Sequence, residues 1–532
     1  MKKNHRQISG VLLSGPPDGS ISGEEVGKTE GVKTKSLDTS AQCISDNTVP
    51  DKKYHGFLGW LSLIPEIENP YHYGKKAKWL ITGVVAIAAA TAPMGASIFY
   101  PATPDMSRDL QVSSTVINLS VAFYLLSSSI FPLWWSSFSE TAGRRTIFII
   151  SFLLHVVFTF VCGMSSNIAM LVVFRLLSGG AAASGQSVGA GTIADIWRPE
   201  ERGYAMSIFY LGPLAGPLFL PLVGGALTEK FGWRSTIWFL TGFGILVLVL
   251  ILLALPETLS AQRKVEASSL DATQRTAIAA PAAQVHPFRR MVGLVKRCMV
   301  EPLRVVVYLR FPAVAIVIYC AAVAFGSCYV LNISMQDAFS QSPYGYSPTI
   351  VGLLFIPSTI GCIVTSVFGG AWIDRIMVRA AEQAGRYDSD GQLIYLPEDR
   401  MGLNAWVSLT VYPASLIWYG WTVQYGVHWI APSIAVLLFG AGSMMVFSAT
   451  TTMLTEFMPR TSSSGVALNN FIRNIFSCIG TIVAQPLINV MGHGWLLTVV
   501  GLVAWTTGNG CVYLLRRNSQ KWRMEMDKAL ND

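Results

Sequence analysis

The sequence predicts an all-α membrane protein in which twelve transmembrane helices form two pseudo-symmetric six-helix bundles. Hydrophobic residues make up 52% of the chain and charged residues only 13%, which leaves too little polar surface to keep so large a body in water. A spanning helix needs roughly 20 mostly apolar residues, and the chain contains about twelve such windows. An apolar run that ends in a charged turn occurs once in each half, at 115–135 and at 349–368, which indicates an internal duplication.

The N-terminal segment, residues 1–75, is rich in Ser, Gly, Lys, Asp and Thr and has no apolar periodicity. Such a segment cannot bury enough surface to fold alone, so we expect a disordered cytoplasmic tail. This tail is either passive or regulated through phosphorylation of its hydroxyl side chains. It lacks a charged-then-apolar start with a small-residue cleavage site, so the first spanning helix is expected to direct membrane insertion.

The apolar windows follow the tail in two equal groups. The first group is expected to form the N-terminal bundle, residues 76–255, and the second the C-terminal bundle, residues 312–515. A polar central loop, residues 256–311, separates the bundles, and residues 516–532 form a short cytoplasmic tail. The windows begin near Trp79, Thr115, Thr146, Ile168, Tyr204, Ser235, Pro312, Thr349, Leu403, Trp429, Gly465 and Trp495.

The distribution of Lys and Arg among the loops predicts that both termini face the cytoplasm. In that orientation the inner loops receive most of the basic residues, and the outer loops keep Arg108, Lys230 and Arg234. The formal net charge of +8 follows from this bias, so we expect no nucleic-acid partner. A basic central loop that faces an anionic lipid leaflet explains the charge better.

The cysteines and histidines give no sign of a metal site or a cofactor. Six of the eight cysteines fall within or at the ends of apolar windows without metal-ligand spacing, as expected for small packing residues. His155 lies in the middle of the third window, where it is either a proton relay or a neutral side chain hydrogen-bonded to a neighbour. No nucleophile–base pair stands out, so we expect no enzyme active site.

The charged turn at 136–145 and its weaker copy predict salt-bridge clamps at the cytoplasmic ends of the two bundles. Their members are Glu140, Arg144 and Arg145 in the first half and Asp374 and Arg375 in the second. Forming and breaking such clamps would supply a two-state element. Determination of topology by positive charge is the alternative explanation of the same residues.

A run of glycines and prolines in the fifth window predicts a close helix contact. Gly removes side-chain bulk and Pro interrupts the helical hydrogen bonds, so two helices can approach closely and bend there. The seam either slides or hinges, or it is static close packing. Its predicted members are Gly212, Pro213, Gly216, Pro217, Gly224 and Gly225.

Two arginines fall inside apolar windows, where an unpaired charge costs at least a few kcal/mol. Arg175 in the fourth window needs a partner or a water-filled cavity, and Asp105 is a candidate unless it only caps a loop. Competition between a proton and a cationic substrate for such a carboxylate would couple their movements. Arg473 in the eleventh window, near Asn470, is either structural or in contact with substrate.

These residues together resemble the major facilitator superfamily, specifically the fungal twelve-span drug:proton antiporters of the quinidine-resistance type. The resemblance extends over nearly all of 79–515. It rests on the segments 94–105, 136–145, 175–181, 212–225, 232–234, 256–258 and 467–474. Ser136, Glu140 and Thr141 depart from the usual loop motif, and Leu220 stands where glycine is common.

The resemblance implies export rather than uptake, with Arg175 in proton coupling and a central cavity between the bundles. An aromatic lining with a few amides suits flat, amphipathic or cationic organic compounds. The implied lining residues are Tyr124, Phe131, Gln186, Tyr210, Tyr329, Asn332, Phe355, Phe447, Asn470 and Arg473.

The sequence therefore predicts a monomeric fungal plasma-membrane antiporter that exchanges small organic molecules for protons in the lipid bilayer. Drugs, weak acids and polyamines are the substrate classes that the resemblance implies. A proton symporter or facilitator for nutrient uptake is the alternative in the same class. A membrane sensor whose tail signals while nothing is carried is the alternative in another class.

Overall fold

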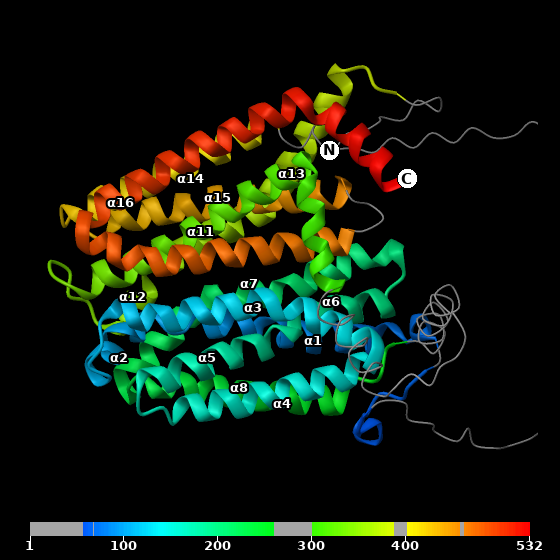
Figure 1. The fold of residues 1–532 in the computed structure, drawn as a ribbon, viewed down its shortest axis with the longest axis horizontal. Helices are drawn as coiled ribbons and strands as arrows, with labels where there is room; N and C mark the ends of the chain where they lie inside the picture. Colours follow the sequence, from blue (N-terminus) through cyan, green and yellow to red (C-terminus); the bar gives the residue numbers. More distant parts are fainter. Residues whose placement is uncertain (1–56, 68, 260–300, 388–401, 458–461, 532) are drawn as a thin grey trace, which may run out of the picture. The chain divides into compact units, whose positions relative to one another are not determined.

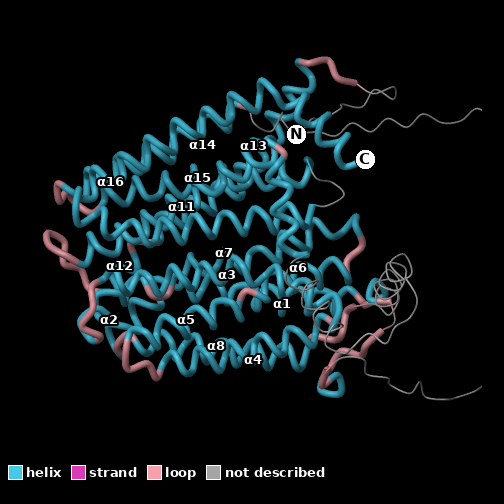
Figure 2. The backbone as a smooth tube through the Cα atoms, in the orientation of Figure 1, coloured by secondary structure: helices cyan, strands magenta, loops and turns pink. Residues whose placement is uncertain are grey.

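The computed structural model describes residues 57–67, 69–259, 301–387, 402–457 and 462–531. All of them belong to one compact unit, Tyr54–Asp532. Figures 1 and 2 show that this part of the chain is built from long helices joined by short loops, as the all-α prediction requires. The predicted tail up to residue 56 and most of the predicted central loop lie outside the described residues.

The N-terminal bundle contains the first eight α-helices, most of which run along a common direction in Figure 1. Pro199 opens its longest helix, where a missing N–H is tolerated. Two glycines with positive φ, Gly143 and Gly232, separate consecutive helices at tight turns. The helices are α1 (Lys75–Ser97), α2 (Thr103–Asp109), α3 (Ser114–Ala142), α4 (Arg144–Gly163), α5 (Ile168–Ala182), α6 (Ser184–Ile196), α7 (Pro199–Phe231) and α8 (Arg234–Ala254).

The C-terminal bundle repeats this design with fewer breaks. Its last helix is interrupted by Gly492, whose φ of 78° and ψ of 171° are not helical, so two arms meet there. This break separates the eleventh and twelfth predicted windows. The helices are α11 (Pro312–Ser340), α12 (Pro348–Leu353), α13 (Ile356–Gln383), α14 (Leu403–Gln424), α15 (Ile430–Phe457) and α16 (Ser462–Asn531).

The long helices confirm the predicted membrane protein. Within the described ranges, 9 segments are long and apolar enough to cross a membrane by length and composition alone. One of them, Ala467–Ser519, contains both arms of α16. With α7 and α14 the described helices account for the twelve predicted windows, because α5 with α6, and α12 with α13, each follow one window.

The described part of the chain includes residues before the predicted tail boundary at residue 75. Two short 3-10 helices, η1 (Gly59–Leu61) and η2 (Pro70–His72), precede α1. The backbone N–H of Leu63 donates to the carbonyl of Leu253 at 2.7 Å, so this segment lies against the end of α8. The end of α8 has carbonyl groups without partners in the helix, and the segment before α1 supplies a donor to one of them.

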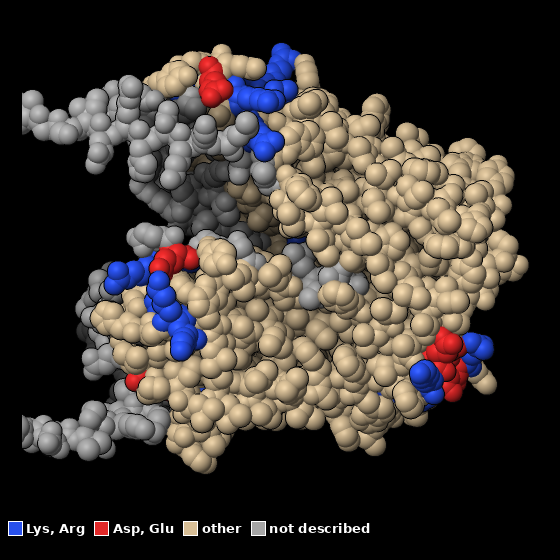
Figure 3. Space-filling model, turned by 180° about the vertical axis from the view of Figure 1, so that it is seen from behind, with Lys and Arg blue, Asp and Glu red and all other residues tan. Residues whose placement is uncertain are grey.

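The two bundles contact each other along a limited set of helices. α3 packs against α16, and α7 packs against α12. Across the first contact Ser129 Oγ donates to the Phe471 carbonyl at 2.8 Å. Figure 3 shows a face that is almost wholly uncharged over its middle, with Lys, Arg, Asp and Glu gathered toward its two ends, as the bilayer requires.

Candidate functional site

Arg175 is buried inside the N-terminal bundle with aromatic neighbours rather than a carboxylate. Its exposed fraction is 2%. The guanidinium carbon lies 3.8 Å from the ring centroid of Phe99 and 4.5 Å from that of Tyr124. Nη1 donates to the Gly95 carbonyl at 2.9 Å, while Nε and Nη2 have no partner among the described residues. The charge is thus held by ring faces and one carbonyl, which leaves the N–H groups of two nitrogens available.

A small cavity of ≈10 Å³, about the room for one water molecule, lies beside this guanidinium. His155 also lines it, and its Nδ1 lies 3.1 Å from the Ser178 carbonyl, which assigns the N–H to Nδ1 when the ring is neutral. Nε2 has no partner in the described part of the chain. The sequence allowed His155 to be a proton relay or a side chain hydrogen-bonded to a neighbour, and the structure displays the hydrogen bond.

A row of aromatic side chains continues from Arg175 into the C-terminal bundle. Tyr100, next to Phe99, meets Tyr329 with ring centroids 6.5 Å apart, and Tyr329 meets Phe325 at 5.3 Å. The row ends at Arg473, whose guanidinium carbon lies 4.2 Å from the ring centroid of Phe325 and 5.8 Å from that of Phe447. Two buried arginines, one from each bundle, therefore lie at the ends of one aromatic row. Such a row suits planar or amphipathic organic ligands.

The two bundles close against each other at the end where α12 begins. Tyr100 stacks on Phe355 with ring centroids 5.8 Å apart and planes inclined by 9°. A Cβ added at Gly225 would overlap the carbonyl oxygen of Pro348, and one added at Gly352 would lie 2.5 Å from that of Pro221. Only glycine allows backbones to approach this closely. Figure 3 shows the surface hollowed between the two halves at the opposite end.

A carboxylate spans the same closed contact. Glu229, near the end of α7, accepts through Oε2 from the backbone N–H of Thr349 at 3.2 Å. Thr349 is in the first turn of α12, whose N–H groups have no partner within the helix. This bond joins the two bundles directly at the closed end.

The predicted glycine–proline run lies on α7, where three of its glycines face α1. A Cβ at Gly212 would overlap the Ala86 carbonyl, and one at Gly224 would overlap that of Ile98. At Gly216 the added atom would lie 2.8 Å from the Met94 nitrogen. The predicted close contact is thus present, whereas its sliding stays a prediction. Gly225 faces the other bundle instead, and the side chain of Pro217 lies outside the described residues.

Arg144 has a different partner from the one predicted. Its Nε lies 3.0 Å from Asp195 Oδ2 on α6, its Nη1 donates to Ser139 Oγ at 2.6 Å, and both ions are nearly fully buried. A Cβ at Gly191 would lie 2.7 Å from the guanidinium carbon, so glycine makes room for it. Glu257 Oε1 accepts from the backbone N–H of Arg144 at 2.9 Å, which draws the first residues of the predicted central loop into the bundle.

Arg145 is fully buried and donates to main-chain carbonyls. Nη2 donates to Leu252 at the end of α8 and to Leu58, both at 2.9 Å, and Nε donates to Phe57 at 3.1 Å. Nη1 donates to Leu255 and, at 3.4 Å, to Ile251. One guanidinium thus satisfies carbonyls at the end of α8 and also holds the segment before α1.

The predicted clamps therefore need a correction in the N-terminal bundle. Glu140 is exposed, and within the described chain no ion pair joins it to Arg144 or Arg145. All the described side-chain partners of Arg144 belong to its own bundle, so its ion pair braces one bundle rather than joining two. In the second half Arg375 is exposed, and the side chain of Asp374 lies outside the described residues.

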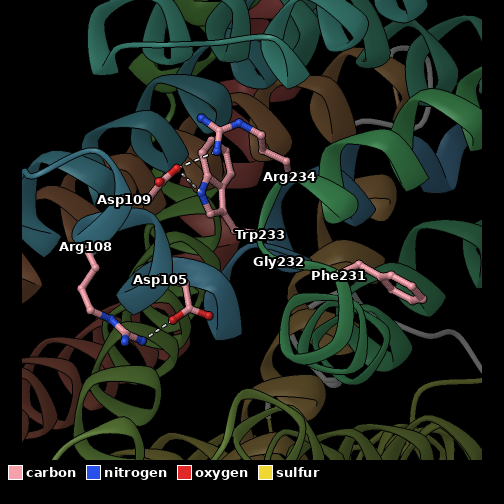
Figure 4. Close-up of a pocket in the computed structure, with 7 residues that line it drawn as sticks. All are labelled: Asp105, Arg108, Asp109, Phe231, Gly232, Trp233 and Arg234. Atoms are coloured by element: carbon pink, nitrogen blue, oxygen red, sulfur yellow. Dashed lines mark hydrogen bonds and ion pairs between the residues drawn. The ribbon is translucent and has the colours of Figure 1, made fainter.

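Asp105 does not lie against Arg175. It forms an ion pair with Arg108, one turn along α2. Both line an open pocket of ≈530 Å³ with Asp109, Phe231, Gly232, Trp233 and Arg234, drawn in Figure 4. Asp109 Oδ2 lies 2.6 Å from Arg234 Nη1 and accepts from Trp233 Nε1 at 2.9 Å. The charges of this pocket therefore neutralise one another, and the pocket is separate from the aromatic row.

The other predicted cavity residues lie in different surroundings. Tyr124 is buried against Arg175, and its hydroxyl donates to the Ala92 carbonyl at 3.0 Å. Phe131 packs edge-on against Trp134 with centroids 5.0 Å apart, on α3 itself. Gln186, Asn332 and Asn470 are half-buried and Tyr210 is 38% exposed, so they keep side-chain surface that a ligand could contact.

Several central residues were not predicted. Phe99 and Tyr100 belong to the segment 94–105, whose prolines are more distinctive in the sequence than its aromatic rings. Phe325 is one apolar residue among many in its window, and only its place beside Arg473 distinguishes it. Asp195 was the most detectable omission, because an acid inside an apolar window needs a partner.

Within the described residues, no group of three or more His, Cys, Asp or Glu could hold a metal ion. The six described cysteines are free.

Comparison with known proteins gives concordant matches. Residues 85–481 match the family model described as Major Facilitator Superfamily. An MFS antiporter, QDR3, of Candida albicans is 32% identical over 585 aligned positions, which cover 90% of this chain and 83% of that protein. Quinidine resistance protein 3 of Saccharomyces cerevisiae is 28% identical over 613 positions, covering 90% and 88%. MFS transporter OpS2 of Beauveria bassiana is 42% identical over 349 positions, covering 65% and 99%.

Proposed function

The chain belongs to the major facilitator superfamily, and from this premise we propose that it is a proton-coupled antiporter that exports small organic molecules by alternating access. The family makes it a membrane transporter rather than an enzyme. The names of two relatives, an antiporter and a quinidine resistance protein, support export and resistance to organic compounds.

The observation that carries the proposal is the asymmetry of the contact between the bundles. At one end Gly225 and Gly352 allow backbone contact and Tyr100 stacks on Phe355, while the opposite end is hollowed. Alternating access requires a ligand region open to one side at a time. We take the hollowed end to be cytoplasmic, so this is the inward-facing state.

The aromatic row between the two buried arginines is the proposed place of substrate binding. Rings offer stacking and cation–π surface to flat drugs, and the free N–H groups of Arg175 can donate to an anionic or carbonyl-bearing compound. Drugs, weak acids and polyamines remain the candidate classes. Protons are the proposed counter-substrate, and Arg175 is the residue proposed to link the two movements.

The loop charges support the proposed orientation, because a bias of Lys and Arg toward the inner loops favours a cytoplasmic position for both termini. The plasma membrane is the proposed location, because a transporter that confers resistance would act most directly there. We propose a monomer embedded in the lipid bilayer, with small organic molecules and protons as its partners.

The test is a substrate-panel assay with the purified full chain in liposomes, with and without an imposed pH gradient. Antiport requires that the proton gradient drive substrate against the direction of proton flow. Movement in the same direction would support the symporter alternative, and gradient-independent equilibration would support a facilitator. No movement of any solute, together with loss of a cellular response on deletion of the N-terminal tail, would support the sensor.

A further inference from the structure

A second ionisable cluster lies inside the C-terminal bundle, away from the aromatic row. Asp337, on the last turns of α11, is 6% exposed and lies within an apolar span. Its Oδ2 is 3.4 Å from Nε2 of His493, which begins the second arm of α16. A carboxylate and an imidazole rarely occur inside a membrane span unless they act in transport of protons or ions.

The carboxylate is surrounded by amides. Asp337 Oδ1 accepts from Gln341 Nε2 at 2.6 Å and from Gln485 Nε2 at 2.9 Å. Gln485 Nε2 also lies 3.4 Å from Asn489 Oδ1 on the same arm of α16. The Oδ1 atom is thus held as an acceptor by two amides from two different segments.

The imidazole can change its protonation without losing a hydrogen bond. His493 Nδ1 lies 2.8 Å from Ser334 Oγ. In the neutral ring Nε2–H donates to Asp337 and Nδ1 accepts from the hydroxyl; in the charged ring both nitrogens donate and the hydroxyl accepts. Uptake of one proton at Nδ1 therefore needs only a rotation of the Ser334 O–H bond.

The cluster also holds a buried acceptor that no described group satisfies. Gln485 is 3% exposed, and its Oε1 atom has no donor in the described residues. A proton added to the Asp337 carboxylate forms a new O–H bond, and a half-turn of the Gln485 amide would bring its Oε1 to that hydrogen. The half-turn gives the buried Oε1 a donor, while Nε2 gives up its bonds to Asp337 and Asn489, so the Gln485 amide exchanges its partners when Asp337 is protonated.

We infer that Asp337 and His493 form a proton-binding site of the C-terminal bundle, with Ser334 and Gln485 as the groups that adapt to its protonation. The other titratable group described as facing Asp337 is Tyr419 of α14, with Tyr344 from the loop after α11 beside Tyr419. Neither supplies a formal positive charge at neutral pH. Among the described groups that face Asp337, His493 is the one that can carry a positive charge, and it does so when it is protonated.

The site lies on helices that also take part in the contact between the bundles. Gln485 and His493 belong to the two arms that meet at Gly492, and Asp337 ties both arms to α11. The first arm also carries Arg473, about 18 Å from Gln485 along the helix. The first arm of α16 packs against α3 of the other bundle. A change in the hydrogen bonds of this arm would therefore act on a contact that changes in alternating access. The assignment of this proton to the transport cycle rests on the proposed antiport.

The direct test reads protonation rather than transport. The full chain in lipid nanodiscs is titrated from about pH 5 to 8, the range in which histidine changes charge, with infrared difference spectra for carboxyl groups and nitrogen-15 NMR for imidazoles. We expect a protonation change in the carboxyl signal, in the imidazole signal, or in both. Asp337→Asn should remove the carboxyl change and move the imidazole change in pH, and His493→Gln should do the reverse. Glu525→Gln, which alters an exposed carboxylate in a surface pair with Lys521, should change neither signal.

The outcomes are distinguishable from those of the transport test. If the wild-type chain couples efflux to a pH gradient but neither group titrates in this range, the inference is overturned. It is equally overturned if Asp337→Asn remains fully coupled. If wild-type efflux ignores the pH gradient, the antiport proposal fails, while the spectra still decide whether the site binds a proton. The wild-type spectra decide this even if a variant does not fold.

Discussion

Tyr100 and Phe355 stack across the contact between the two bundles with their rings nearly parallel, 5.8 Å between centroids. Each ring comes from a short segment beside a helix break, Tyr100 in η3 (Tyr100–Ala102) and Phe355 between α12 and α13. The closed end of the molecule is thus held by residues whose backbones can move without unwinding a long helix. The aromatic row begins directly behind this stack.

Replacing Phe355 with Ala should weaken closure at this end. A stacked pair contributes about 0.5–1.5 kcal/mol beyond its buried area, so the open-to-closed ratio should rise several-fold. Distance measurements between nitroxide labels at Lys230 and Tyr425, both exposed, would report the longer distance more often. Phe219→Ala removes a 58% exposed ring from α7 and serves as the control. Equal distance distributions in both variants would contradict the role of the stack.

Gly225→Ala should prevent the same closure by a steric route. The added Cβ would overlap the Pro348 carbonyl, and a main-chain atom cannot rotate away as a side chain can. We expect normal amounts of protein in the membrane and loss of substrate efflux from liposomes. Gly242→Ala, in α8, meets nothing within 4 Å and should transport normally. Wild-type efflux by the Gly225 variant would mean that this end need not close.

Asp195→Asn should destabilise the N-terminal bundle, because Arg144 would keep its buried charge without an ionic partner. Removal of one member of a buried pair typically costs about 3–5 kcal/mol. Thermal unfolding in detergent would show a clearly lower midpoint. Glu140→Gln changes an exposed carboxylate of the same turn and should leave the midpoint unchanged. The reverse ranking would restore Glu140 as the functional partner.

Arg175→Ala should abolish efflux driven by a pH gradient while the protein still inserts. Lysine should not rescue it, because a compact ammonium cannot lay a flat face on Phe99 while donating to the Gly95 carbonyl. Efflux from liposomes at several imposed gradients would separate lost coupling from lost binding. Full gradient-driven efflux by the alanine variant would exclude Arg175 from coupling.

The helices were predictable because the bilayer demands long apolar segments, and both the charged turns and the glycine run lie where the sequence placed them. The partners of the charged side chains were harder to predict from the sequence. Arg144 finds Asp195 51 residues away because α4 and α6 are neighbours, a fact that hydropathy does not contain. Asp105 and Arg108 are three residues apart on one helix, a spacing that places two side chains on the same face. Their ion pair could therefore have been predicted from the sequence.

The central aromatic row was only half predictable. Tyr329, Phe355 and Phe447 were expected from the fold that the resemblance implies, whereas Phe99 and Phe325 look like ordinary apolar residues until a guanidinium is placed over them. Asp337 and His493 were not singled out, because they lie 156 positions apart and meet only where α16 turns back along α11.

The grip of Arg145 on Phe57 and Leu58 has a practical consequence for where the chain can be shortened. A version that starts after Leu58 would remove two acceptors from this buried guanidinium and leave the segment before α1 less firmly held to the end of α8. Shortened forms of the protein, whether made for crystallography or fused to a fluorescent reporter, should therefore retain the peptide from Phe57 onward, even though it precedes the first membrane crossing.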